Sequence, residues 1–322
     1  MTAPRVLTIV LNWRTPEMSL KSATAAQRAM AGIAGEIVIV DNNSGDGSFE
    51  KMQAETSGWD RVRVVQSGHN GGFGAGNNAG MHEGLSDGTR PDYVYILNSD
   101  AFPAEGAIAA LLAHLEATPK AGLAGSHIHG PDGAPHVSCF RFPSILGEFE
   151  GAARIGPISR LLRHHAVPLP MAETTQPVDW LAGASLMIRQ EVLEQIGGFD
   201  ETFFLYFEET DLCRRAAQAG WQTHYVATSR VEHIGSVSTG MKGWDRVPDY
   251  WFASRRHYFI KNHGRGYLAL VTLAHLTAAS LGSLWRLIRR KGAPRPPHFL
   301  RDLVLGDLGS ALRGPIKRKA DA

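Results

Sequence analysis

Residues 6–12, VLTIVLN, decide the fold class. A continuous apolar run that closes on a polar residue is typical of a strand buried on both faces of a parallel sheet. Comparable runs follow at residues 37–40, 62–65 and 93–97, each after a helical or glycine-rich passage. Strands of this length alternating with helices predict βαβ units, and therefore an α/β fold with a mostly parallel central sheet covered on both faces.

Composition limits the classes of protein that the chain can belong to. It has 322 residues, enough for one large domain or two, and a formal net charge of +2. A charge this close to zero predicts neither nucleic-acid binding nor a strongly acidic partner. Cys139 and Cys213 have no metal or redox spacing, so we expect buried thiols in a reducing compartment. The first apolar run enters a polar segment at once, which indicates a strand rather than a signal peptide.

Polar, small and acidic residues follow the predicted strands. They are Asn12, residues 41–44 (DNNS), residues 68–78 and residues 98–100 (NSD). In parallel sheets of this kind, ligands bind beyond the carboxyl ends of the strands. This clustering predicts a site for a nucleotide or another phosphorylated ligand.

A glycine-rich segment, GHNGGFGAGNNAG, occupies residues 68–80. It is not a dinucleotide fingerprint, because that motif needs G-x-G-x-x-G spacing straight after the first strand. Its asparagines favour side chains and bare backbone that reach a base, ribose or diphosphate at a helix N-terminus. The alternative is a merely flexible loop.

Asp100 and His233 are candidate metal ligands. A carboxylate at a strand end can meet a cation that bridges two phosphates, although such an Asp is as often a turn or a helix N-cap. A lone His is more often structural than a ligand. The metal interpretation of His233 therefore depends on its meeting Asp100 in space.

Residues 197–215, GGFDETFFLYFEETDLCRR, place five acids among aromatic residues. Carboxylates in such a setting are expensive to desolvate, which suggests that they have a function. A helix from about Leu205 puts Glu209 on the stripe that faces inward, while Glu208, Asp211 and Arg215 fall on a neighbouring, more solvated face. Helix-dipole compensation and an Asp211–Arg215 ion pair explain that second face but do not explain Glu209.

The second half has a different character. Residues 141–178 are rich in Pro, His and Arg with weak periodicity, which is typical of a functional loop or lid. Residues 267–285 carry no formal charge and are followed by four basic residues, Arg286, Arg289, Arg290 and Lys291. Leu270, Leu273, Leu281, Leu284 and Ile288 align on one side, which favours a helix on a membrane surface through residues 267–291. A helix packed on the core and a membrane span are the alternatives.

Five motifs occur in an order that resembles a known family. They are VIVDNNS (38–44), NGGFGAGN (70–77), LNSD (97–100), DWLAGA (179–184) and the acidic stretch followed by Glu232-His233. The chain resembles a family 2 glycosyltransferase of the GT-A fold, close to the bacterial rhamnosyltransferase and galactofuranosyltransferase branch. The resemblance implies a GT-A domain over residues 1–240, with a nucleotide-sugar half (1–103) and an acceptor and catalytic half (104–240), and a C-terminal helical segment over 241–322.

The resemblance also implies roles for particular residues. The nucleotide-sugar site would contain Asn12, Asp41, Ser44, Asn70, Asn77, Asn98 and Asp100. Asp100 would be the last acid of a D-x-D element whose first position is Asn98, and it would hold Mg²⁺ or Mn²⁺ together with His233. Glu209 would be the catalytic base, with Glu208 and Asp211 as runners-up.

For several other residues the sequence allows two different roles. Asp200 and Glu201 either close a turn or face the acceptor sugar. Trp180 either stacks on a sugar ring or packs in the core. Arg255, with Arg256 and Lys261, either grips the diphosphate or lies on a solvated helix face.

The implied reaction is an inverting, metal-assisted displacement that moves rhamnose from dTDP-rhamnose to a hydroxyl of a lipid-linked or polysaccharide acceptor. A UDP-hexose or UDP-galactofuranose donor is the alternative within the class. A nucleotide-binding dehydrogenase or epimerase, and a non-catalytic glycan-binding module, are alternatives outside it. We expect a cytoplasmic protein, peripheral on the inner face of the bacterial membrane, and keep a homodimer as one option for its assembly.

Overall fold

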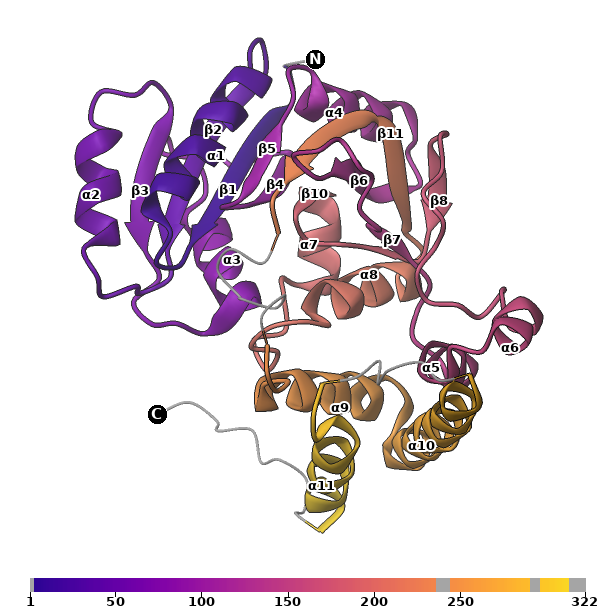
Figure 1. Ribbon diagram of the computed structural model, residues 1–322. Coiled ribbons are helices and arrows are strands. Elements are labelled where there is room, and N and C mark those ends of the chain that lie inside the picture. Colours follow the sequence, from indigo (N-terminus) through magenta and orange to yellow (C-terminus); the bar gives the residue numbers. More distant parts are fainter. Residues whose placement is uncertain (1–2, 236–243, 290–295, 313–322) are drawn as a thin grey trace. The chain divides into compact units, whose positions relative to one another are not determined.

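The computed structural model describes residues 3–235, 244–289 and 296–312, and the chain divides into two compact units (Figure 1). The first unit is formed by Met1–Phe142 with Pro168–Lys242, and the second by Pro143–Val167 with Gly243–Ala322. The second unit therefore draws on residues 143–167, which the sequence placed in the middle of the transferase domain.

A nine-stranded sheet forms the centre of the first unit, in the order β3-β2-β1-β4-β10-β6-β11-β5, with β8 paired to β11. Its strands are β1 (Arg5–Asn12), β2 (Ala34–Asp41), β3 (Val62–Gln66), β4 (Tyr93–Asn98), β5 (Ala101–Pro103), β6 (Ala121–His129), β8 (Gln176–Val178), β10 (Ser185–Arg189) and β11 (Gln222–His233). β1 to β4 run parallel, and β10 joins β4 to β6 by antiparallel pairing on both sides. The four predicted strands are confirmed, and so is the mostly parallel sheet.

Helices cover both faces of this sheet. They are α1 (Pro16–Ala29), α2 (Ser48–Glu55), α3 (Gly72–Glu83), α4 (Ala107–Ala117), α7 (Gln190–Ile196) and α8 (Glu208–Gln218). In β1, Val6 and Val10 pack towards α1, α2 and α4, whereas Leu7 and Ile9 pack towards α3, α7 and α8. Both faces of the strand are buried, which is why its sequence shows no alternation of polar and apolar residues. The two thiols are free and buried, as predicted.

β11 is one strand over residues 222–233, and its pairing with β6 is interrupted by an irregularity between Val226 and Arg230. One predicted boundary was wrong. The acidic helix α8 begins at Glu208 and not near Leu205. Tyr206 and Phe207 have φ angles of 70° and 71°, and this left-handed backbone is incompatible with a helix that starts earlier.

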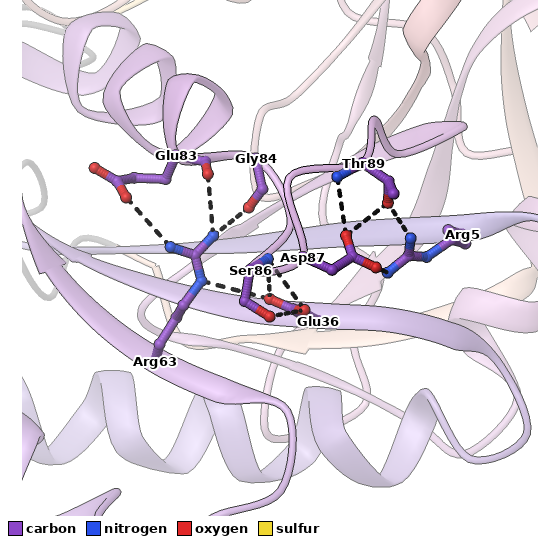
Figure 2. A network of polar contacts seen from close by, with 8 residues as sticks. All are labelled: Arg5, Glu36, Arg63, Glu83, Gly84, Ser86, Asp87 and Thr89. Carbon is purple, nitrogen blue, oxygen red and sulfur yellow. Dashed lines mark hydrogen bonds and ion pairs between the residues drawn. The ribbon is translucent and has the colours of Figure 1, made fainter.

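An ion-pair network holds the strand ends that lie away from the predicted ligand edge (Figure 2). Arg63 near the start of β3 lies 3.4 Å from a carboxylate oxygen of Glu36 on β2 and 3.2 Å from Glu83 at the end of α3. Arg5 at the start of β1 pairs with Asp87 at 2.8 Å. These contacts join the loop after α3 to the amino ends of the strands, so the carboxyl ends remain the side available to a ligand.

The second unit is helical. It consists of α5 (Ile145–Ala153), α6 (Gly156–Leu161), α9 (Asp249–His263), α10 (Arg265–Ile288) and α11 (Phe299–Leu312). The prediction of an irregular passage over 141–178 was wrong in its first half, because α5 and α6 lie there. α5 packs along α10, and a Cβ at Gly282 would lie 2.3 Å from the carbonyl oxygen of Ala153.

α10 is long and apolar enough to cross a membrane, but part of it is buried in the unit. The residues facing inward are Leu268, Val271, Thr272, Ala278, Ala279 and Gly282. The predicted stripe with Leu270, Leu273 and Leu284 is the side that stays exposed. One face of α10 therefore packs on the core of the second unit, and the opposite face is an exposed apolar surface. Arg290 and Lys291 lie outside the described residues.

Arg255 was expected either to grip a diphosphate or to lie on a solvated face, and the structure contradicts both. The side chain is fully buried within α9 of the second unit. Its guanidinium lies 3.1 Å from Glu148 of α5 and 3.4 Å from Asp307 of α11. The charge of Arg255 is therefore used to hold helices of the second unit together.

Candidate active site

Asp41 is the centre of a buried polar group at the carboxyl ends of β1 and β2. Asn12 is its register partner across these strands and donates through Nδ2 to Asp41 Oδ1 at 2.8 Å. Ser44 donates to the same carboxylate through its hydroxyl at 2.6 Å and through its backbone N–H at 3.1 Å. The three residues predicted together are thus brought together, with the carboxylate in a fixed orientation.

Arg14 belongs to the same loop cluster and was not singled out from the sequence. Its backbone N–H donates to Ser44 Oγ at 3.0 Å, and its guanidinium Nε donates to the Ser44 carbonyl at 3.2 Å. Arg14 has a φ of 57°, which is uncommon for a residue with a side chain. The only sequence signal for it was its place directly beyond the first strand.

Asn70 and Asn77 make their hydrogen bonds at the start of α3 and within it. Asn70 accepts from Asn42 Nδ2 at 3.0 Å and from the backbone N–H of Gly72 at 3.1 Å, so it closes the turn into α3. Asn77 is buried within α3 and donates to the carbonyl of Phe73 at 2.9 Å. Among the described residues, its side-chain oxygen has no hydrogen-bond partner.

The glycine-rich segment is a packed helix rather than a flexible loop. α3 starts at Gly72, where φ is +91° and a Cβ would lie 1.8 Å from the carbonyl oxygen of Phe204. At Gly76 a Cβ would lie 2.4 Å from Leu11 of β1. The N–H of Phe73 already donates to the Phe204 carbonyl at 2.9 Å. The glycines therefore allow close packing, and this first-turn N–H group is occupied within the protein.

Asp100 and His233 meet, which was the condition for reading them as a metal pair. The antiparallel pairing of β5 with β11 sets Ala101 opposite His233, and so brings Asp100 Oδ1 to 3.1 Å from His233 Nε2. Asn98 Nδ2 lies 3.4 Å from the same ring nitrogen. A carboxylate and an imidazole suit a divalent cation, although no group of three or more His, Cys, Asp or Glu that could hold one occurs among the described residues.

Glu209 is half-buried at the start of α8. A Cβ at Gly183 would lie 3.8 Å from its Oε1 and 3.0 Å from the ring of Phe73. Burial raises the pKa of Glu209, against the lowering effect of hydrogen bonds from its own backbone N–H and that of Gly183. Within the described part of the chain, Oε2 is buried and accepts no hydrogen bond. The carboxyl is therefore held on one side and leaves one oxygen for another partner.

Glu208 was expected on a more solvated face, and this was wrong. It is only 2% exposed because α3 covers that side of α8, where a Cβ at Gly74 would lie 3.8 Å from the Glu208 Cβ. Burial raises the pKa of Glu208 well above its ordinary value, and the neighbouring carboxylate of Glu209 raises it further. We conclude that Glu208 holds its proton more tightly than an exposed Glu does.

Asp211 forms the predicted ion pair with Arg215, at 2.8 Å, but in a buried position rather than a solvated one. The Arg215 guanidinium also donates to the carbonyls of Ile196 and Gly198, each at 2.7 Å. This pair ties α8 to the loop that follows α7. Asp211 therefore has a charged partner within the protein, whereas the contacts of Glu209 among the described residues are with backbone N–H groups.

The candidate acceptor residues have structural partners as well. Asp200 accepts from the Thr202 N–H at 3.0 Å, which closes a turn, and Glu201 accepts from Asn78 Nδ2 at 2.9 Å. The ring of Trp180 stacks on Phe140 at 4.1 Å, where β9 (Trp180–Leu181) pairs with β7 (Cys139–Phe140). The contact of Asp200 corresponds to the turn interpretation and the stacking of Trp180 to the core interpretation, whereas Glu201 contacts a side chain of α3.

Known proteins resemble the chain in sequence and in fold. Residues 4–267 match the family model described as "Glycosyltransferase like family 2". The chain is 31% identical over 264 residues to the N-acetylglucosaminyl-diphospho-decaprenol L-rhamnosyltransferase of Mycobacterium tuberculosis, covering 70% of this chain and 83% of that protein. It is 26% identical over 200 residues to the rhamnosyltransferase WbbL of Escherichia coli K12, covering 61% of this chain and 72% of that protein.

A solved structure shares the fold. The mannosyltransferase PcManGT of Pyrobaculum calidifontis, determined with GDP-mannose and Mn²⁺, superposes with a TM-score of 0.57 and 18% sequence identity, covering 97% of this chain and 81% of that chain. The similarity confirms the GT-A fold that the motifs predicted. The chain thus belongs to the glycosyltransferase-like family 2 and is a glycosyltransferase.

Proposed function

We propose that the protein transfers rhamnose from dTDP-rhamnose to a hydroxyl group of a lipid-linked or polysaccharide acceptor. Two relatives are rhamnosyltransferases, and the name of one includes a lipid diphosphate, N-acetylglucosaminyl-diphospho-decaprenol. The observation that carries the proposal is the Asp100–His233 pair at the same end of the sheet as Asp41. A nucleoside site beside a ligand pair for a divalent cation suits a nucleoside-diphosphate sugar.

Asp41, Asn12 and Ser44 would orient the nucleoside, and Asp100 and His233 would hold Mg²⁺ or Mn²⁺. Two protein ligands leave most of a six-coordinate shell to phosphate oxygens and water, so the cation would bind mainly together with the donor. When bound, it would neutralise negative charge on the departing diphosphate. Mn²⁺ in the mannosyltransferase of the same fold supports this choice of ion.

Glu209 would act as general base in a single inverting displacement. The acceptor hydroxyl gives its proton to Glu209 while its oxygen bonds to the anomeric carbon from the face opposite the leaving group. The bond from that carbon to the diphosphate oxygen breaks, and the nucleoside diphosphate leaves with the electron pair. A raised pKa suits Glu209 to this step, because it must be ionised to accept a proton and basic enough to keep it.

Thermal unfolding with a panel of dTDP-, UDP- and GDP-sugars, with and without Mn²⁺, tests the donor and the metal together. A bound ligand raises the melting temperature in proportion to ln(1 + [L]/Kd). We expect the largest shift with dTDP-rhamnose and Mn²⁺, and loss of the Mn²⁺-dependent part in Asp100→Asn. A larger shift with UDP-galactofuranose or a UDP-hexose would identify that nucleotide sugar, and not dTDP-rhamnose, as the donor. No response to any nucleotide sugar would contradict the proposal.

We also propose that the protein works in the cytoplasm, peripherally on the inner face of the cytoplasmic membrane. A nucleotide-sugar donor is water-soluble and a lipid-linked acceptor is not, so the enzyme must meet both at a membrane surface. The apolar side of α10 supports this location.

A further inference from the structure

The second unit exposes a stripe of leucines along α10. Leu273, Leu284 and Leu287 are 60%, 56% and 76% exposed, in a helix whose other face is packed against its own unit. Exposed Thr277 and Ser280 lie between Leu273 and Leu284, but no formal charge occurs between residues 267 and 285. Monomeric soluble proteins rarely expose large apolar patches without a partner.

α6 lies at the carboxyl end of this stripe. α5 and α10 run in the same direction, because Ile145 contacts Tyr267 near their starts and Ala153 contacts Gly282 near their ends. α6 follows α5 directly, and its Ile158 packs in the same cluster as Trp285. Leu161, at the last position of α6, is 80% exposed. A further exposed leucine, from a distant part of the chain, thus belongs to the helix whose Ile158 packs in the same cluster as Trp285 of α10.

Basic residues occur in and just after α6 and at the end of α10. Arg160, Arg163 and His164 line a hollow of about 450 Å³ together with Pro157 and Leu161. Arg289 follows the last turn of α10, with its guanidinium over the Trp285 ring at 4.5 Å. Apolar side chains beside cations suit the interface of a bilayer, because the apolar groups can contact acyl chains while the cations contact lipid phosphates.

We propose that the stripe of α10 together with α6, called here the α10–α6 face, docks on a membrane surface that contains anionic phospholipid. The leucines would enter the boundary between headgroups and acyl chains, and the arginines that line the hollow would contact lipid phosphates. This proposal adds to the proposed location the face of the protein and the class of lipid that it contacts. It rests on the proposed function in one respect, because a lipid-linked acceptor is what brings the enzyme to a membrane.

The contacts of α10 argue against a membrane span. His275 Nδ1 lies 2.8 Å from Glu148, and the Thr272 hydroxyl donates to Asp307 at 2.6 Å. A helix that crossed the bilayer would have to leave these partners and would expose the Glu148–Arg255 ion pair. Docking on the surface keeps the packed face in place.

A second copy of the chain is the competing occupant of the face. A symmetric interface buries the same patch of both subunits, and the residues that define this face include arginines but no acid to pair with them. Anionic headgroups instead offer opposite charge to all of them. The charge pattern therefore favours the membrane.

Vesicle flotation of the full chain tests the proposal. We expect binding to vesicles of phosphatidylcholine with phosphatidylglycerol, little binding to phosphatidylcholine alone, and weaker binding at high salt. Leu284→Glu with Leu287→Glu should weaken binding about tenfold or more, since two apolar anchors are lost. Arg160→Gln with Arg163→Gln should selectively reduce the preference for anionic vesicles. Val137→Glu, at a 49% exposed residue of the first unit, is the matched control and should bind as wild type.

Unchanged vesicle binding by the leucine and arginine variants, or no binding by the wild type, would overturn the proposal. So would a wild-type dimer in light scattering that becomes monomeric in the leucine variant, because the face would then be a subunit interface. Thermal melting confirms that each variant is folded. The nucleotide-sugar shift, measured without vesicles, should be equal in all of them, so failure of docking and failure of the proposed reaction are distinguishable.

Discussion

At the scale of single residues, the two neighbouring carboxyls of α8 have different surroundings. Glu209 is held by the N–H of Gly183 and keeps one oxygen without a protein partner among the described residues. Glu208 is enclosed beneath α3, and burial raises its pKa well above the ordinary value. The sequence selected Glu209 through the helical stripe, but it placed Glu208 on the wrong kind of surface. The difference in role follows from the cover that α3 provides.

Substitution of the two carboxyls by amides should separate their roles. Glu209→Gln is expected to lower kcat about 100-fold or more, with the dTDP-rhamnose thermal shift retained, because a general base is lost and the donor site is intact. Glu208→Gln should keep most of the activity, since the amide resembles the protonated acid. An inactive Glu208→Gln beside an active Glu209→Gln would reverse the assignment.

The same pair predicts the pH dependence. Glu209 must be ionised, so kcat/KM should rise with pH through its raised pKa, and this limb should stay in place in Glu208→Gln. A carboxyl with a raised folded-state pKa contributes stability that is present at low pH and is lost as pH rises from about 4.5 through that pKa. Glu208→Gln should therefore raise the melting temperature more at pH 8 than at pH 4. An equal shift at both pH values would show that folding does not raise the pKa of Glu208.

At the scale of elements, α3 links the strand edge to the catalytic helix. Its glycines let it approach β1 closely, and the N–H of Phe73 in its first turn donates to the carbonyl of Phe204 in the segment before α8. The composition of the segment was read as a ligand-binding loop, because glycine allows both a flexible turn and close packing. Only the contacts of Gly72 and Gly76 distinguish these uses.

Gly72→Ala should therefore destabilise the protein strongly. The new Cβ would meet the Phe204 carbonyl at 1.8 Å at a positive φ, and we expect a loss of roughly 3 kcal/mol in the free energy of unfolding. Gly68→Ala is the matched control, because its φ is +79° and nothing lies within 4 Å, so it should lose only about 1 kcal/mol. Urea unfolding measures both, and equal losses would mean that the Phe204 contact is unimportant.

At the scale of the whole molecule, four distant segments assemble the second unit around buried charges. Glu148, Arg255, His275 and Asp307 come from α5, α9, α10 and α11. Although burial raises the pKa of Glu148, Arg255 and His275 bring it down to about 2. A carboxyl whose pKa is lower in the folded than in the unfolded protein stabilises the fold at pH values above its unfolded-state pKa. For Glu148 this stabilisation is lost as the pH falls from about 4.5 towards 2.

Arg255→Met should destabilise the second unit by roughly 3 kcal/mol or more at pH 7, because Glu148 would be left buried with its main partner removed. The loss should shrink at pH 3, where Glu148 can take up a proton. Thermal unfolding followed by circular dichroism at the two pH values measures this. A loss of equal size at both would indicate that packing of the Arg255 side chain, and not its charge, is what matters.

The sequence by itself determined the parts that local pattern encodes. Apolar runs set the first four strands, and the helical stripe selected Glu209, because periods of strand and helix are read within a few residues. The tertiary structure decided the rest. Asp100 and His233 are 133 residues apart and meet only through the β5–β11 pairing. Glu208 is buried because α3 covers it, and residues 143–167 join the second unit by packing on α10 and by the ion pair of Glu148 with Arg255. Such contacts depend on residues far apart in the chain, and local periodicity carries no information about them.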